Sequence, residues 1–272
     1  MDLELVKKKP VLTGFIFIVI YVLLARLSLT LAFDNGNASP IWPPSGLAVA
    51  FIFLLGRKYF PAIALGALIA NLLTFGMNGP LTSNVVLSSF FIAFGNTLEA
   101  FICFQFYKLA CENETPLKSA LTFMTFIAVS SAACFASAFI AALTLWQNEI
   151  VSSSSYNTIL ITWWLGDFIG ILTFGTLIIS FWQKYHRSKG SLTEYTFTLF
   201  SLSICSIVIF SHIDNQAFIS QIYFILLPVF MWISFRFNFF KTLFSINLLS
   251  ILAILGTSDG KAPFQSESIN DS

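Results

Sequence analysis

The sequence predicts an all-α fold: a polytopic transmembrane helix bundle of roughly nine spans. Three observations support this prediction. Of the 272 residues, 57% are hydrophobic and 10% are charged, whereas soluble domains average roughly half and a quarter. Apolar runs recur along the chain, and they approach or exceed the roughly 20 residues that cross a bilayer as a helix. Lys and Arg fall in alternate loops between these runs, which is typical of multi-pass membrane proteins.

The first apolar run, Val11–Phe33, follows the basic triplet Lys7-Lys8-Lys9. This arrangement has the outline of a signal peptide. The run exceeds the roughly 7–15 residues of a typical signal core, so we interpret it as an uncleaved first helix. The basic residues before it place the N-terminus in the cytoplasm.

The next stretch, IWPPSGLAVAFIFLLGRKYFPAIALGALIAN, contains two shorter runs, Ile41–Gly56 and Tyr59–Phe75, joined by a basic turn. Pro43 and Pro44 are suited to the first turn of a helix, where the missing N–H costs nothing. Trp42 favours the membrane–water boundary. The stretch therefore predicts a helical hairpin with its turn in the cytoplasm.

Six further runs complete the bundle. They are Ser83–Tyr107, Leu117–Trp146, Tyr156–Trp182, Thr193–Ser211, Ile219–Phe235 and Phe239–Leu255. Lys and Arg mark one set of loops, and the other set (34–40, 76–82, 147–155 and 212–218) has none. This alternation predicts a multi-pass protein, with residues 1–257 forming one integral membrane domain and residues 258–272 a polar tail.

Three ionisable residues lie inside predicted spans: Arg26, Glu99 and Asp167. A charge in a membrane segment is costly and usually faces the bundle interior, where it pairs or binds something. Judged by depth along their helices, Arg26 and Asp167 could form an intramembrane ion pair. Asn96 shares a helix face with Glu99 because the two are three residues apart. The alternative is that these groups only hold the helices together.

The densest polar and aromatic cluster is WWLGDFIG, residues 163–170. Trp163 and Trp164 could stack on a ligand beside Asp167. Gly166 and Gly170 would let a neighbouring helix or the ligand approach the backbone. The alternative is an aromatic belt at the membrane interface.

Enzymatic chemistry is not predicted, and neither a metal nor a cofactor is expected. The sequence has no H-E-x-x-H motif, and no predicted span supplies a second Asp for an aspartyl protease dyad. His186 and His212 fall in loops on opposite sides of the membrane, so they do not make a shared metal site. Cys103, Cys111, Cys134 and Cys205 form no C-x-x-C pair. A near-neutral net charge of +1 argues against nucleic-acid binding.

Several motifs together resemble the first-type membrane-associated sensor (MASE) domain of bacteria. They are Trp42-Pro43-Pro44-Ser45-Gly46, Gly56-Arg57-Lys58-Tyr59-Phe60-Pro61, Leu65-Gly66 with Asn71, Gly95-Asn96 with Glu99, Trp163-Trp164-Leu165-Gly166-Asp167, Arg236-Phe237 and Gly260 to Phe264. The resemblance covers nearly the whole chain, in order.

The resemblance implies a sensory input module of the bacterial inner membrane, used in two-component or cyclic-di-GMP signalling. In this family the module usually precedes a histidine kinase, a diguanylate cyclase or a cyclic-di-GMP phosphodiesterase. The chain has no Gly-Gly-Asp-Glu-Phe signature. It also stops where the family normally adds one more helix. We therefore expect either a truncated piece of a longer protein or a stand-alone module that signals through a partner.

We expect a non-enzymatic sensor with a pocket in the outer half of the bundle, which binds a small ligand or responds to a membrane partner such as a transporter. The expected pocket residues are Trp42, Pro43, Pro44, Asn71, Asn96, Glu99, Trp163, Trp164 and Asp167. A small-solute transporter is the alternative, because transporters also place polar residues at mid-membrane. A third reading is an inactive remnant that only packs with partners.

Overall fold

The computed structural model describes residues 8–30, 39–112, 114–182, 190–210 and 226–258. These residues form helices and contain no strand, which confirms the all-α prediction for the part of the chain described. The chain divides into two compact units, residues 1–182 and 183–272.

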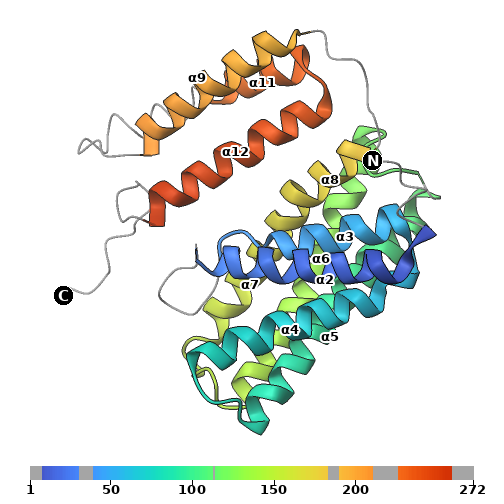
Figure 1. The fold of residues 1–272 in the computed structure, drawn as a ribbon, viewed down its shortest axis with the longest axis vertical. Helices are drawn as coiled ribbons and strands as arrows, with labels where there is room; N and C mark the ends of the chain where they lie inside the picture. Colours follow the sequence, from blue (N-terminus) through green and yellow to red (C-terminus); the bar gives the residue numbers. More distant parts are fainter. Residues whose placement is uncertain (1–7, 31–38, 113, 183–189, 211–225, 259–272) are drawn as a thin grey trace. The chain divides into compact units, whose positions relative to one another are not determined.

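The first unit contains most of the helices (Figure 1). They are α2 (Pro10–Leu29), α3 (Pro43–Leu55), the 3₁₀ turn η1 (Arg57–Tyr59), α4 (Phe60–Asn78), α5 (Ser83–Cys111), α6 (Ala120–Gln147), α7 (Tyr156–Gly170), the π-helical segment η2 (Ile171–Gly175) and α8 (Thr176–Trp182). The second unit contains α9 (Leu192–Phe210), α11 (Leu226–Arg236) and α12 (Phe239–Ser258).

Each predicted apolar run contains a helix, but the number of membrane spans is not confirmed. Five helical stretches are long and apolar enough to cross a membrane: Pro10–Leu29, Arg57–Asn78, Ser83–Cys111, Ala120–Gln147 and Tyr156–Trp182. The apolar parts of the other helices in the described residues, such as Leu192–Ile207 and Phe239–Leu255, are shorter. The 13 residues of α3 rise only about 20 Å, less than the roughly 30 Å thickness of the hydrocarbon core.

Local sequence signals explain where these helices begin and end. Pro residues occupy the first turns of α2, α3 and α4, where their missing N–H has no partner to lose. Ser119 and Thr122 form a capping box at the start of α6. Gly56 ends α3 with φ +93°, a backbone conformation that favours glycine.

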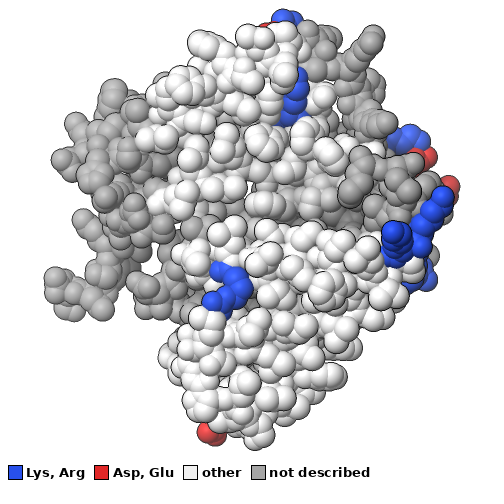
Figure 2. All heavy atoms as spheres, viewed as in Figure 1, with Lys and Arg blue, Asp and Glu red and all other residues white. Residues whose placement is uncertain are grey.

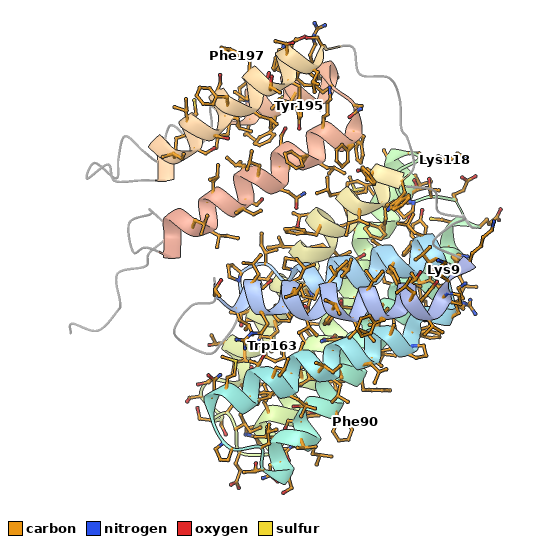
Figure 3. All side chains as sticks on the ribbon, in the orientation of Figure 1. Lys9, Phe90, Lys118, Trp163, Tyr195 and Phe197 are labelled. Atoms are coloured by element: carbon orange, nitrogen blue, oxygen red, sulfur yellow. The ribbon has the colours of Figure 1, made fainter. Side chains whose placement is uncertain are left out.

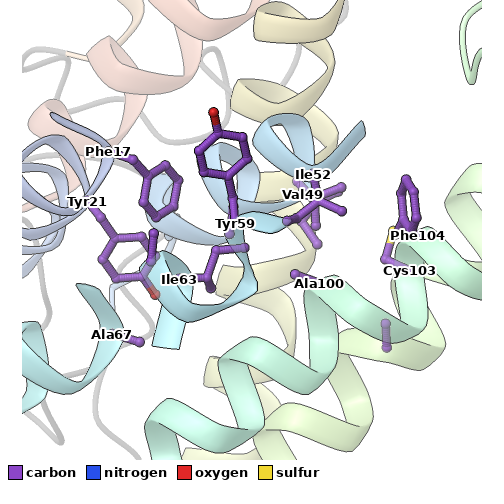
Figure 4. Close-up of a cluster of buried hydrophobic side chains, with 14 of the residues drawn as sticks. Phe17, Tyr21, Val49, Ile52, Tyr59, Ile63, Ala67, Ala100, Cys103 and Phe104 are labelled. Atoms are coloured by element: carbon purple, nitrogen blue, oxygen red, sulfur yellow. The ribbon is translucent and has the colours of Figure 1, made fainter. Parts of the chain in front are cut away.

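The short helix α3 occupies the centre of the first unit. It packs against α2, α5, α7, η2 and α8. Val49, Ala50 and Ile52 are fully buried, and Phe17, Tyr21, Ile63 and Phe104 belong to the same apolar cluster (Figure 4). A helix that is apolar on every side is expected to be enclosed by others, and α3 has that environment.

The outer surface of the first unit is also apolar. Large side chains stand open to the surroundings, including Val11 at 86% exposure and Leu121 at 77%. Figure 2 shows few charged atoms on the face in view. Because a water-soluble protein rarely leaves so much continuous apolar surface exposed, these side chains are suited to lipid contact.

Basic residues gather at one end of the first unit. Lys9 and Lys118 lie at that end in Figure 3, whereas Trp163 lies away from it. Successive helices run in alternate directions, so the turn at Arg57 and Lys58 belongs to the same end. The opposite end contains the C-terminal part of α4 and the turn before α7.

The second unit has its own apolar cluster. Tyr195, Leu202, Ile233 and Phe237 are buried together. Arg236 at the end of α11 donates two hydrogen bonds to Glu194, from Nε at 2.6 Å and from Nη2 at 2.8 Å. The segment from Asn238 to Lys241, at the start of α12, is joined to α9 by a hydrogen bond, which the Tyr195 hydroxyl donates to the Lys241 backbone carbonyl at 2.9 Å.

Residues 259–272 of the predicted polar tail lie outside the described residues.

Candidate functional site

A cavity of about 220 Å³ opens at the end of the first unit opposite the basic residues. Its lining is mostly apolar, with a few polar groups, as is common in ligand sites. The lining residues are Leu29, Ser39, Trp42, Asn71, Thr74, Phe75, Ile92, Asn96, Leu145, Ile150, Val151, Ile159, Trp163, Gly166 and Asp167. Five residues predicted from the sequence are in this set: Trp42, Asn71, Asn96, Trp163 and Asp167.

Backbone contacts hold α3 and α7 together where they form one wall of the cavity. The Trp42 N–H donates to the Gly166 carbonyl oxygen at 2.9 Å. A Cβ atom on Gly170 would lie 2.1 Å from the Trp42 carbonyl oxygen, and one on Gly46 would lie 2.2 Å from the Gly170 carbonyl oxygen. Glycine at both positions therefore allows the helices to touch through their backbones. This contact positions Trp42 at the cavity, immediately before Pro43 begins α3.

Asp167 is the ionisable residue that lines the cavity. Its side chain is buried at 6% exposure, and Ser45 in the first turn of α3 donates to its Oδ1 at 2.9 Å. The partial positive charge at a helix N-terminus favours a negative group at this position. Asp167 is therefore held where α3 begins, beside Trp42.

Glu99 lies behind the cavity wall at 1% exposure. Its carboxyl group lies near that of Asp167. The Glu99 oxygen Oε2 is buried without a hydrogen-bond partner among the described residues. Glu99 on α5 and Asp167 on α7 thus form a buried acidic pair.

Asn96 connects the cavity to the polar groups around it. Its Nδ2 donates to the Tyr21 hydroxyl at 3.4 Å, and its Oδ1 accepts from Ser137 at 3.2 Å. These contacts join α2, α5 and α6, so a change at the cavity would reach three helices.

Four of the predicted site residues lie outside the cavity lining. Glu99 lies behind it, and Pro43 and Pro44 are buried in the first turn of α3. Trp164 faces α6, where its Nε1 donates to the Ser131 carbonyl at 3.0 Å and its ring makes an edge contact with Phe135. Adjacent helical residues point about 100° apart, which is why Trp163 and Trp164 separate.

The predicted ion pair between Arg26 and Asp167 does not form in the structure. Among pairs in which both residues are described, ion pairs join Lys118 to Glu114 and Arg236 to Glu194. Arg26 is half-buried on α2, a helix that packs mainly on α3 and α4. Asp167 instead accepts a hydrogen bond from the Ser45 hydroxyl.

Some contributors were not singled out from the sequence as pocket residues. Tyr21, Ser39, Ser45, Thr74 and Ser137 support or line the cavity. Tyr21 carries the clearest available signal, because a hydroxyl deep inside an apolar span usually needs a partner. Ser and Thr are weak signals in a membrane helix, since they can bond to their own backbone.

The described residues hold no group of three or more His, Cys, Asp or Glu side chains suited to a metal ion. His186 and His212 lie outside the described residues. The four cysteines are free. The chemistry available at the cavity is thus hydrogen bonding, aromatic contact and negative charge.

The fold and the cavity together define a class: a multi-helix membrane protein with a mostly apolar cavity that contains a few polar groups. The MASE1 family model matches residues 12–272. The chain belongs to the MASE1 family, as its motifs suggested. MASE1 is a family of membrane-associated sensory input domains, not a catalytic one. No curated protein and no solved structure matches the chain.

Proposed function

We propose that the chain is a sensory input domain that detects a small ligand in the cavity lined by Trp42, Asn71, Asn96, Trp163 and Asp167. One observation carries the proposal: these polar and aromatic residues, distant in the sequence, line a single cavity in a sensory family. The buried hydrogen bonds around Asn96 and Asp167 give the site a defined shape. A defined polar site within an apolar bundle is costly unless it has a role.

The proposed location is the bacterial inner membrane, with the N-terminus in the cytoplasm. Lys and Arg mark the end of the first unit that holds Lys9 and Lys118, and such residues favour the cytoplasmic side. The cavity lies at the other end, where the loops contain no Lys or Arg. A ligand would therefore enter from outside the cell.

Ligand binding would act on the contact between α3 and α7. Trp42 precedes α3, while Trp163 and Asp167 belong to α7, so one ligand would touch both helices. The π-helical segment η2 begins four residues after Asp167. Such segments are rare and often mark functional sites. A ligand shifts the helix arrangement only if it binds one arrangement more tightly than the other.

The signal would pass to an output domain such as a histidine kinase, a diguanylate cyclase or a cyclic-di-GMP phosphodiesterase. The 272 residues contain no Gly-Gly-Asp-Glu-Phe signature. We therefore place the output outside this sequence, either further along the same polypeptide or on a separate partner.

Thermal unfolding of the purified chain against a metabolite panel tests ligand binding. A ligand that binds the native state raises the melting temperature. We expect at least one small polar compound to do so, and Asp167→Asn to weaken that effect. Glu149→Gln is the matched control, because it removes a carboxylate from the turn before α7, outside the cavity lining. If no compound stabilises the chain, ligand sensing at this cavity is rejected.

A fusion to a reporter output domain tests signalling. Asp167→Asn should alter the reporter response to the stabilising compound, while Glu149→Gln should leave it unchanged. Reconstituted liposomes separate the sensor from the transporter alternative. Sustained uptake of the compound against its gradient would overturn a purely sensory role.

A further inference from the structure

The charge of the cavity lining restricts the class of ligand. Asp167 is the ionisable residue among the lining residues, which include no Lys, Arg or His. A buried carboxylate or phosphate is normally met by basic side chains. The lining therefore offers an anionic ligand no counter-charge, and the N-terminal end of α3 already faces Asp167.

Aromatic side chains complete this environment. Trp42, just before α3, and Trp163, four residues before Asp167 on α7, both belong to the cavity lining. Trp is the aromatic residue that attracts a cation most strongly through its ring face. Two Trp residues and one carboxyl group form a site with the chemistry that binds organic ammonium ions.

Among the described residues, no Lys, Arg or His side chain lines the cavity as a counter-charge to Asp167. Arg26 does not line the cavity and forms no ion pair with Asp167. The stretches 76–82 and 147–155, which connect helices at this end of the first unit, contain no Lys or Arg. These connections therefore supply no cation that would compete for Asp167.

We propose that the cavity binds a small organic ammonium ion, with Asp167 as its counter-charge and Trp42 and Trp163 as its aromatic contacts. The inference rests on the proposed ligand-binding function and names the ligand class. A volume of about 220 Å³ corresponds to about seven water molecules at roughly 30 Å³ each. The ligand is thus the size of a small amine with a compact apolar part.

The Glu99–Asp167 pair fits this ligand. Glu99 adds a second buried carboxyl group behind the cavity wall, and its Oε2 atom has no hydrogen-bond partner among the described residues. A buried negative charge without a partner is strongly unfavourable. An ammonium ion in the cavity supplies a positive charge to these two carboxyl groups, and no bond is made or broken.

Probes of one shape and different charge test the proposal on the full chain in lipid nanodiscs. Three probes share one carbon skeleton: 3,3-dimethylbutylamine is cationic, 3,3-dimethylbutanol is neutral and 3,3-dimethylbutanoate is anionic. Choline serves as a quaternary cation. Binding is read from the melting temperature and from tryptophan fluorescence. We expect the cations to bind at least about tenfold more tightly than the alcohol, because a hydrogen bond to a charged group is stronger than one between neutral groups.

Variants locate the binding site. Asp167→Asn should reduce the preference for cations, and the Asp167→Asn, Glu99→Gln double variant should abolish it, since Glu99 can carry the charge when Asp167 cannot. Trp163→Leu should weaken choline binding several-fold. Trp164→Leu is its matched control, because Trp164 contacts Ser131 outside the cavity lining, and it should leave choline affinity unchanged.

The outcomes separate the ligand class from the function. Equal binding of the amine and the alcohol, or tighter binding of the anion, overturns the ammonium proposal while leaving ligand sensing in place. A cation preference that survives the double variant also overturns it. If the wider metabolite panel also fails to stabilise the chain, the proposed function itself is rejected.

Discussion

Replacing Gly170 by Ala tests whether the backbone contact between α3 and α7 builds the cavity wall. The added Cβ would lie 2.1 Å from the Trp42 carbonyl oxygen and 2.6 Å from the Trp42 carbonyl carbon. Non-bonded carbon atoms normally approach to about 3.5–4.0 Å. Both contacted atoms belong to the backbone, so no side chain can rotate away and α3 must move.

The magnitude follows from three terms. Overpacking in a tight core costs about 1–3 kcal/mol, and backbone contacts place this case near the upper value. Displacing α3 also loses the Trp42 N–H bond to Gly166, about 1 kcal/mol. Ala favours a helix over Gly by about 1 kcal/mol. The net loss of stability is about 3 kcal/mol, which lowers the melting temperature by about 6–12 °C.

The assay is thermal unfolding of the purified chain, followed by tryptophan fluorescence. Gly14→Ala is the matched control, because Gly14 is also helical and its added Cβ would meet only the Ala62 Cβ at 3.7 Å, an ordinary contact. The control should melt at the wild-type temperature or slightly above it. Equal melting temperatures for Gly170→Ala and Gly14→Ala would refute the reasoning.

Three further predictions follow from the same structure. Ser137→Ala removes the 3.2 Å hydrogen bond to Asn96, so we expect a loss of about 1 kcal/mol in thermal unfolding; an unchanged melting temperature would contradict it. In a cysteine-free background, Gly79→Cys should react with a membrane-impermeant maleimide in intact cells, and Glu114→Cys should react only after lysis. The reason is that loops rich in Lys and Arg face the cytoplasm. The reverse labelling pattern would overturn the proposed topology. Glu194→Gln removes the negative charge of the ion pair with Arg236. Because exposed ion pairs are screened by salt, its small effect on the melting temperature should disappear in high salt. An effect independent of salt would contradict this prediction.

Much of the site could be predicted because polar residues stand out in a membrane sequence. Asn71, Asn96 and Asp167 are conspicuous within apolar runs, and a polar group in such a run usually faces the bundle interior. All three line the cavity. Trp42 was predicted from its place before a Pro-Pro helix start, and the structure places it there.

The orientation of each helix could not be predicted in the same way. In a soluble helix, polar residues mark the face turned to water. In α2 and α7, apolar side chains face both the lipid and the interior, so the pattern does not distinguish the faces. For this reason the sequence predicts that Trp163 and Trp164 both line the pocket and that Arg26 pairs with Asp167.

The class of protein follows from the sequence alone: an all-helical membrane domain of the MASE1 family, with each helix near its observed position. Composition, Pro starts and loop charges are local properties, so they can be read along the chain. The three-dimensional packing was needed to show that Asp167 accepts a hydrogen bond from Ser45 and forms no ion pair with Arg26. Those pairings depend on how α3 rotates against α7, and backbone contacts at Gly46 and Gly170 set that rotation.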